Sequence, residues 1–199
     1  MYVASIISLG GNIMYAVATL KGKIKPNITS WILWSLPPII IFAVQRSQGV
    51  DLQALLSLAV GLSPVIIVIS ALVKANGKFK PAKLDIICAV IASSALAVWL
   101  ITGKANLAII LSILAGCAAG LPTLMKAYSK PKSESAVPFI CGSVSAIITL
   151  LTLQTFSLDD AAFAVYLLIS NLILVFFIAI RPHLSSIPTR QQDESFSES

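Results

Sequence analysis

Charged residues are scarce in this sequence. Asp, Glu, Lys and Arg together make up 11% of its 199 residues, whereas they supply about a quarter of a typical soluble domain. Hydrophobic residues reach 57%, and the mean hydropathy is +0.93. A soluble fold of this length has too little interior to bury so much apolar surface. These values argue against a soluble globular domain and indicate an integral protein of the lipid bilayer.

The side chains that most enzymes need are also sparse. The single histidine is His183, which we expect to be solvated, and no clustered carboxylates, nucleophile elbow or phosphate-binding glycine loop occur. Cys88, Cys117 and Cys141 lie in apolar segments without metal-ligand spacing, so we expect them to be packing residues. The sequence therefore predicts no enzymatic activity, no metal site and no cofactor.

The sequence is rich in apolar segments close to the roughly 20 residues that a bilayer requires. These segments are residues 2–20, 28–45, 52–73, 85–102, 106–127, 136–155 and 161–181. Lipid leaves no backbone group unpaired, and the segments lack the alternation of barrel strands, so each is expected to be a helix. The first segment lacks the basic start and cleavage site of a signal peptide and is expected to remain. The predicted fold is an all-α membrane protein with seven transmembrane helices.

The basic residues orient this predicted bundle, because Lys and Arg are retained in cytoplasmic loops. Of the 14 basic residues, all but Arg46 and Lys104 follow the first, third, fifth or seventh segment. The opposite side also holds Asp51, Asp159 and Asp160. We therefore expect an integral protein of the plasma (cytoplasmic inner) membrane, with the N-terminus outside and the C-terminus in the cytoplasm. The net charge of +6 is then a topology signal, and no nucleic-acid partner is expected.

The second half of the chain echoes the first at an offset of about 108 residues. The offset aligns Ser35 with Ser143 and Asp51 with Asp159, and both halves run from a basic loop through a helix to an acidic loop and a further helix. Three spans are an odd number, so a parallel second copy requires an intervening inversion helix. The predicted domains are two triple-helix repeats at 1–74 and 105–182, a linker with the fourth helix at 75–104, and a disordered cytoplasmic tail at 183–199.

Each half carries a related motif where its first helix meets the following loop. Asn12-Ile13-Met14-Tyr15 precedes Lys21–Asn27, and Gly120-Leu121-Pro122-Thr123 precedes Lys130–Ser135. In these features the chain resembles a bacterial branch of the SWEET and PQ-loop superfamily of small membrane transporters. The Pro-Gln pair of that superfamily is absent, and the second motif keeps only its proline. The resemblance implies the three-plus-one-plus-three plan and a substrate held between the third helices of the two repeats.

Polar side chains in the middle of a span are costly, so they usually face the bundle interior or an aqueous path. Asn12 and Asn171 are the main cases, and the offset pairs Asn171 with Ser63. The resemblance implies that Asn171 and Ser63 bind substrate. The alternative is an interhelical hydrogen bond worth about 0.6 kcal/mol.

Two tryptophans lie three residues apart on one face of the second segment. Trp31, near the cytoplasmic end, is expected in an interfacial aromatic belt. Trp34 lies deeper and, with Ser35, offers a flat apolar face and a hydroxyl to a ring-shaped or sugar-like ligand. The offset matches the tryptophans to Phe139 and Gly142, so any substrate sandwich would be asymmetric. The predicted substrate-binding residues are Asn171, Ser63, Asn12, Trp34, Ser35 and Tyr15.

Prolines in four segments are candidate hinges, because a proline inside a helix removes a hydrogen bond and bends it. These are Pro122, Pro64, Pro37 and Pro138, with a static bend as the alternative for each. Ion-coupled pumps normally require a charged residue near the middle of a span, and no segment of this chain has one. The sequence therefore predicts a facilitative, uniport-like transporter of a small neutral or polar metabolite, a sugar among the candidates, that works by alternating access.

A second hypothesis is a non-transporting membrane scaffold or sensor, whose basic cytoplasmic loops bind anionic lipid or a protein partner. Oligomeric state is open: small homologues in the superfamily dimerise from single repeats, whereas a fused pair could act alone or as a homo-oligomer. Gly116 and Gly120 are expected to allow close helix packing.

Overall fold

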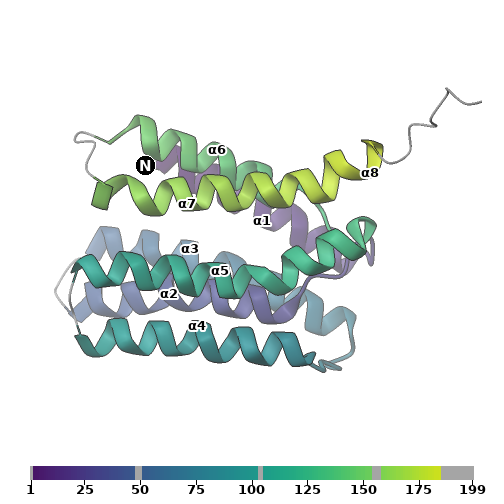
Figure 1. Cartoon of the computed structure of the whole chain (residues 1–199), viewed down its shortest axis with the longest axis horizontal. Helices are drawn as coiled ribbons and strands as arrows, with labels where there is room; N and C mark the ends of the chain where they lie inside the picture. Colours follow the sequence, from purple (N-terminus) through teal and green to yellow (C-terminus); the bar gives the residue numbers. More distant parts are fainter. Residues whose placement is uncertain (1, 48–50, 103–104, 154–157, 185–199) are drawn as a thin grey trace, which may run out of the picture.

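The computed structural model describes residues 2–47, 51–102, 105–153 and 158–184, and these ranges are almost wholly helical (Figure 1). Within them no strand occurs, so the predicted all-helical fold is confirmed. The main helices are α1 (Tyr2–Leu20), α2 (Ile28–Ser47), α3 (Asp51–Lys74), α4 (Lys83–Thr102), α5 (Ala105–Ser129), α6 (Val137–Leu151) and α7 (Leu158–Val175). A 3-10 turn, η1 (Pro131–Ser133), precedes α6, and α7 continues through the π-helical turn η2 (Phe176–Ile180) into α8 (Arg181–Leu184).

The helix bounds follow the predicted apolar segments closely, except at the end of α6. This helix was expected to reach residue 155 but ends at Leu151, where the Thr152 hydroxyl donates to the carbonyl oxygens of Ile148 and Thr149, each at 2.9 Å. A threonine that bonds the last carbonyls competes with further helix. The 15 residues of α6 span about 22 Å, which is less than the hydrocarbon core of a bilayer.

Three helical stretches in the described part of the chain are long and apolar enough to cross a membrane: Val3–Leu20, Lys83–Thr102 and Ala161–Leu184. Gly61–Lys74 and Val137–Leu151 are apolar but shorter. Large hydrophobic side chains also lie exposed on the outside of the helices, including Ile6, Ile69, Val90, Ile110, Ile147 and Ile169. Such a surface is suited to contact with lipid.

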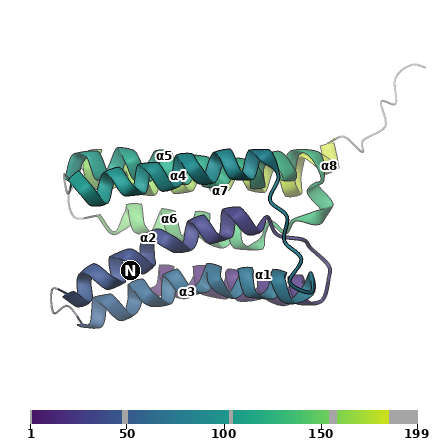
Figure 2. The ribbon, with the colours of Figure 1, turned by 90° about the horizontal axis from the view of Figure 1, so that it is seen from below.

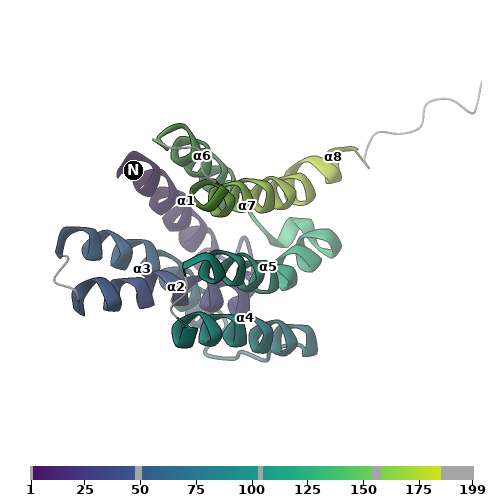
Figure 3. The same ribbon diagram turned by 60° about the vertical axis from the view of Figure 1, so that its left-hand side comes forward.

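The contacts can be followed in two groups of three consecutive helices, α1–α3 and α5–α7, although α1 and α5 also pack on helices outside their own group. In the first group α3 lies against both α1 and α2, and in the second α7 lies against both α5 and α6. Figure 2 shows α4, α5 and α7 on one side of the bundle and α1 and α3 on the other. The groups meet crosswise, because α1 packs on α6 and α2 packs on α5. Helix α4 lies along α5 and also contacts α2 (Figure 3).

A buried aromatic cluster lies where α1, α2 and α6 meet. The ring centroid of Trp31 is 5.1 Å from that of Tyr15 and 6.2 Å from that of Phe139. Trp31 is only 4% exposed, so its expected place in an interfacial belt is wrong. The face of α2 that carries Trp31 turns toward α1 and α6, where the indole buries more apolar area than it would at a membrane surface.

Two glycines of α5 lie against neighbouring helices, Gly116 against α7 and Gly120 against α2. A Cβ atom at Gly116 would lie 2.8 Å from Cζ of Tyr166 on α7, whereas one at Gly120 would lie 3.5 Å from Cζ2 of Trp34 on α2. Gly116 therefore permits an approach that a side chain would block, which bears out the packing role expected for this glycine. At Gly120 a Cβ atom would make only an ordinary van der Waals contact, so close packing does not require a glycine there. Near the end of the described part of the chain, Arg181 of α8 donates a hydrogen bond of 2.7 Å to the Tyr128 carbonyl oxygen. Its guanidinium also lies 4.0 Å from the centroid of the Tyr128 ring, and both contacts hold α8 against α5.

Candidate functional site

Asn12 and Ser63 meet near the middle of α1 and α3. Asn12 Nδ2 donates a hydrogen bond of 2.7 Å to Ser63 Oγ, and Ser63 is 5% exposed. The fold therefore brings two of the predicted substrate-binding residues together within the first group of helices. Their bond is the interhelical contact that the sequence left open as an alternative.

Asn171 lies half-buried near the middle of the apolar stretch of α7, beside α6. A Cβ atom at Gly142 would lie 2.7 Å from Asn171 Nδ2, so the amide occupies the space that this glycine leaves. Within the described residues no hydrogen bond reaches the Asn171 side chain. In the described part of the chain α3 and α7 are not packed against each other. Ser63, the residue that the offset pairs with Asn171, accepts its hydrogen bond from Asn12.

Trp34 connects α2 with the second group of helices. Its ring centroid lies 5.1 Å from that of Trp31 and 6.3 Å from that of Phe139, and its edge faces Gly120 of α5. Trp34 therefore belongs to an aromatic cluster that draws on α2 and α6. Gly142, which the offset pairs with Trp34, contributes no ring, and a substrate sandwich at Trp34 stays a prediction.

Ser35 follows Trp34 but does not share its role. Its hydroxyl donates to the Ile32 carbonyl oxygen of the same helix at 2.6 Å, and the side chain is 5% exposed. A hydroxyl that bonds its own helix is a poorer donor for a ligand. Ser35 therefore contributes mainly to packing of α2.

Glu134 is a buried carboxylate that sequence reasoning missed. It follows η1 in the loop before α6 and is 5% exposed. The Tyr15 hydroxyl donates to Oε2 of Glu134, and Lys126 Nζ donates to Oε1 at 2.7 Å. Burial raises the pKa of Glu134, and the charge of Lys126 opposes that rise. Tyr15, predicted to bind substrate, is instead fully buried against this carboxylate.

A sequence signal for this cluster did exist. Glu134 is the only acidic residue in a loop that also contains Lys130 and Lys132, and Lys126 lies within reach in the last turn of α5. A lone carboxylate among lysines, just before an apolar helix, is a candidate for a buried ion pair. The topology argument treated Lys126 as a loop charge and so passed over it.

Further contacts join the two groups of helices at the end of the bundle where the lysine-bearing loops lie, called here the basic end. The backbone N–H of Lys25 donates to the Ser133 carbonyl oxygen at 2.8 Å. Together with the contacts of Tyr15 with Glu134 and of Trp31 with Phe139, this bond holds the loop after α1 against the loop before α6.

The predicted hinge prolines fall in two kinds of position. Pro37, Pro64 and Pro122 lie inside α2, α3 and α5, where each leaves a carbonyl oxygen without its helical donor. Pro138 lies in the first turn of α6, where the missing N–H has no intrahelical partner and no bend follows. The π-helical turn η2 is a further irregularity, between α7 and α8. It lies just before Pro182 of α8, which has no N–H to donate to the preceding turn, so the sequence does carry a signal for it.

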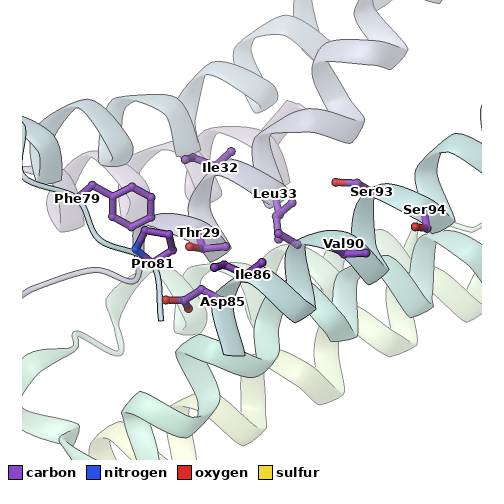
Figure 4. A pocket seen from close by; sticks show the side chains of 11 residues that line it. Thr29, Ile32, Leu33, Phe79, Pro81, Asp85, Ile86, Val90, Ser93 and Ser94 are labelled. Atoms are coloured by element: carbon purple, nitrogen blue, oxygen red, sulfur yellow. The ribbon is translucent and has the colours of Figure 1, made fainter. Parts of the chain in front are cut away.

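A groove with a volume of about 500 Å³ lies between α2, α4 and the loop 75–82 (Figure 4). It is lined by Thr29, Ile32, Leu33, Phe79, Pro81, Asp85, Ile86, Ala89, Val90, Ser93 and Ser94. None of the predicted substrate-binding residues belongs to this lining. The groove is therefore distinct from the polar positions in the middle of α1, α3 and α7.

Several predicted features lie outside the described residues or side chains. These are the charges assigned to the outer side (Arg46, Asp51, Lys104, Asp159 and Asp160) and the tail from residue 185 onward. His183 is described and lies exposed in α8. Cys88, Cys117 and Cys141 are free thiols, and no group of three potential metal ligands occurs in the described part of the chain.

The fold defines an all-helical protein with three described helices that are long and apolar enough to cross a membrane. Comparison with protein-family models, curated proteins and solved structures found no match. Any assignment of function therefore depends on the residues of this chain.

Proposed function

We propose that the chain is a facilitative transporter of a small neutral or polar metabolite. The observation that carries this proposal is Asn171, a half-buried amide near the middle of an apolar helix with no hydrogen bond from the described residues. An unpaired amide is costly in apolar surroundings and usually serves a ligand or a path. A hydroxyl or amide of a passing substrate would supply the missing partner.

The crosswise packing supports two parallel triple-helix units, α1–α3 and α5–α7, with α4 as the inversion helix. Units related by an axis along the membrane normal flank a central path. The third helices, α3 and α7, are not packed against each other in the described part of the chain. We expect Ser63 and Asn12 on one side of the proposed path and Asn171 on the other. A substrate between them exchanges hydrogen bonds with both units.

The basic ends form the closed side of the proposed carrier. There the contacts of Glu134 with Tyr15, of Phe139 with Trp31, and between the two loops join the units. We expect this side to face the cytoplasm across the plasma (inner) membrane, with the N-terminus outside, because lysine-bearing loops are usually retained there. Release of substrate into the cytoplasm requires these contacts to separate.

Flux into proteoliposomes tests the proposal with a panel of sugars, amino acids and nucleosides. We expect one class to enter down its own gradient, without a proton or sodium gradient. Asn171→Leu should abolish this flux. Ser70→Ala, which removes a hydroxyl bonded to the Ile66 carbonyl oxygen of its own helix, should leave it unchanged. A folded protein that moves no member of the panel while a protein partner co-purifies would favour the scaffold hypothesis instead.

A further inference from the structure

The groove between α2 and α4 has a polar end at Thr29 and Asp85, an aliphatic middle, and two serines, Ser93 and Ser94, at its far end. Figure 4 places Thr29 and Asp85 beside the loop residues Phe79 and Pro81, and Ser93 at the far end. From Ile86 to Ser94 the groove follows α4 for about 12 Å. The wall along this length is mainly aliphatic, and an acyl chain fits that combination of length and chemistry.

The polar end contains a hydroxyl without a partner. Thr29 is 7% exposed, and its Oγ1 makes no hydrogen bond within the described structure. A buried hydroxyl left unpaired costs free energy that a ligand atom can recover. Its neighbour Asp85 is already engaged, because Asn27 Nδ2 donates to Oδ1 at 2.9 Å and the Ala82 N–H donates to Oδ2 at 2.7 Å. The open hydrogen-bonding position in the groove is therefore at Thr29.

The rim beside this polar end is basic. Lys78 and Lys80 flank Phe79 in the loop, Lys83 begins α4, and all three are exposed. Thr29 and Asp85 lie in the first turns of α2 and α4. In a membrane, such helix starts lie at the level of the lipid headgroups and ester linkages. Positive charge, a free hydroxyl and an apolar channel thus follow one another in the order of a phospholipid's phosphate, ester and acyl chain.

We propose that this groove binds one anionic glycerophospholipid. Its acyl chain lies along the aliphatic wall between α2 and α4, and its phosphate lies near Lys78, Lys80 and Lys83. The Thr29 hydroxyl donates to an ester carbonyl oxygen. A zwitterionic lipid of the same length fills the channel equally well, but its ammonium group offsets the attraction of the lysines. The inference depends on the membrane location in the proposed function and not on transport.

Native mass spectrometry of the delipidated full chain in detergent tests the site, with phosphatidylglycerol and phosphatidylcholine of identical acyl chains. We expect one phosphatidylglycerol to be retained, with an affinity about tenfold or more above that of phosphatidylcholine at low salt. K78Q/K80Q/K83Q should abolish this preference. The matched triple K21Q/K23Q/K25Q, in the loop after α1, should preserve it. Equal losses in both triples would indicate diffuse attraction to the basic face and overturn the proposal.

Thr29→Val tests the hydroxyl by thermal unfolding with and without phosphatidylglycerol. Without lipid the variant should unfold at a higher Tm than the wild type, because an unpaired buried hydroxyl is removed. The increase in Tm that phosphatidylglycerol causes should be smaller in the variant than in the wild type. Thr123→Val removes another buried hydroxyl that lacks a partner, in α5 outside the groove. It should raise Tm without changing the gain from lipid. If phosphatidylglycerol raised the Tm of Thr29→Val as much as that of the wild type, the proposed hydrogen bond to the ester would be contradicted.

Ser93→Leu keeps the test independent of the buried threonine, since Ser93 is exposed. The added side chain fills the far end of the groove and should lower the affinity for phosphatidylglycerol severalfold, and unchanged retention would overturn the groove as the site. Lipid binding is scored by mass and substrate flux separately. A protein that transports but does not prefer phosphatidylglycerol would contradict this inference alone, whereas a protein that binds the lipid but moves no solute would contradict only the proposed transport.

Discussion

At the scale of single residues, the chain places one carboxylate where apolar packing would be expected. Glu134 is buried between Tyr15 of α1 and Lys126 of α5. A buried carboxylate is tolerated only when it is paired and hydrogen-bonded, and removal of one partner is costly. The cluster therefore couples the stability of the basic end to contacts between the two groups of helices.

Tyr15→Phe should destabilise the fold by about 2 kcal/mol, because it removes a hydrogen-bond donor from a buried charged acceptor. Unfolding in detergent measured by circular dichroism checks this value. Tyr128→Phe is the matched control, since that tyrosine is exposed and its ring faces Arg181. Equal effects of the two substitutions would contradict the role assigned to the Tyr15 hydroxyl.

Glu134→Gln should flatten the pH dependence of stability. Because folding raises the pKa of Glu134 above its ordinary value of 4.5, the folded state binds this proton more tightly than the unfolded state. The stability contribution is thus complete below pH 4.5 and is lost as pH rises through the raised folded pKa. Tm measured across this range should fall less steeply in the variant. Lys132→Gln, an exposed change in the same loop, should retain the wild-type slope.

At the scale of secondary-structure elements, small residues decide how closely the helices approach. Gly142 of α6 admits the Asn171 amide of α7, and Gly116 of α5 admits Tyr166 of α7. The interior prolines add carbonyl oxygens without helical donors in α2, α3 and α5. Helix α5 combines both features, because it contains a closely packed glycine and an interior proline.

Gly142→Ala should destabilise the chain by about 1–2 kcal/mol, because its Cβ atom would overlap Asn171 and force a shift in a packed region. It should also reduce flux by displacing the amide. Gly10→Ala is the matched control in α1, where a Cβ atom meets nothing within 4 Å. That substitution should stabilise the helix by about 0.5–1 kcal/mol. Similar effects at the two glycines, measured by thermal unfolding, would contradict the packing described for α6 and α7.

Pro122→Ala should lower flux while membrane insertion and yield stay intact, because it restores a helical hydrogen bond and stiffens α5. Pro138→Ala lies in the first turn of α6 and should leave flux close to that of the wild type. Proteoliposome uptake for both variants provides the measurement. Unchanged uptake in Pro122→Ala would remove the hinge proposal for α5.

At the scale of the whole molecule, the loops with lysines share one end of the bundle. The Lys25 N–H bonds the Ser133 carbonyl oxygen, and a Cβ atom at Gly22 would lie 2.8 Å from Cε of Lys74. The loops after α1, α3 and α5 therefore lie close together. Positive charge gathered at one end is the pattern that orients helical membrane proteins.

Reporter fusions should place this end in the cytoplasm. Green fluorescent protein fused after Gly77, after Ser129 or at the C-terminus should fluoresce, and alkaline phosphatase at the same three positions should be inactive. A fusion between α2 and α3 should show the reverse pattern. Active phosphatase at the basic ends would invert the proposed topology.

Sequence by itself determined the helical segments and the lysine-bearing loops, since hydrophobic length and charge are local properties that lipid and water select directly. Only the tertiary structure decided which faces of these helices meet. It buried Trp31 against Tyr15 and Phe139, brought Asn12 to Ser63, and opened a groove beside Thr29. In a helix that is apolar on all sides, periodicity does not separate the lipid-facing face from the buried one. Contacts between residues far apart in the chain make that distinction.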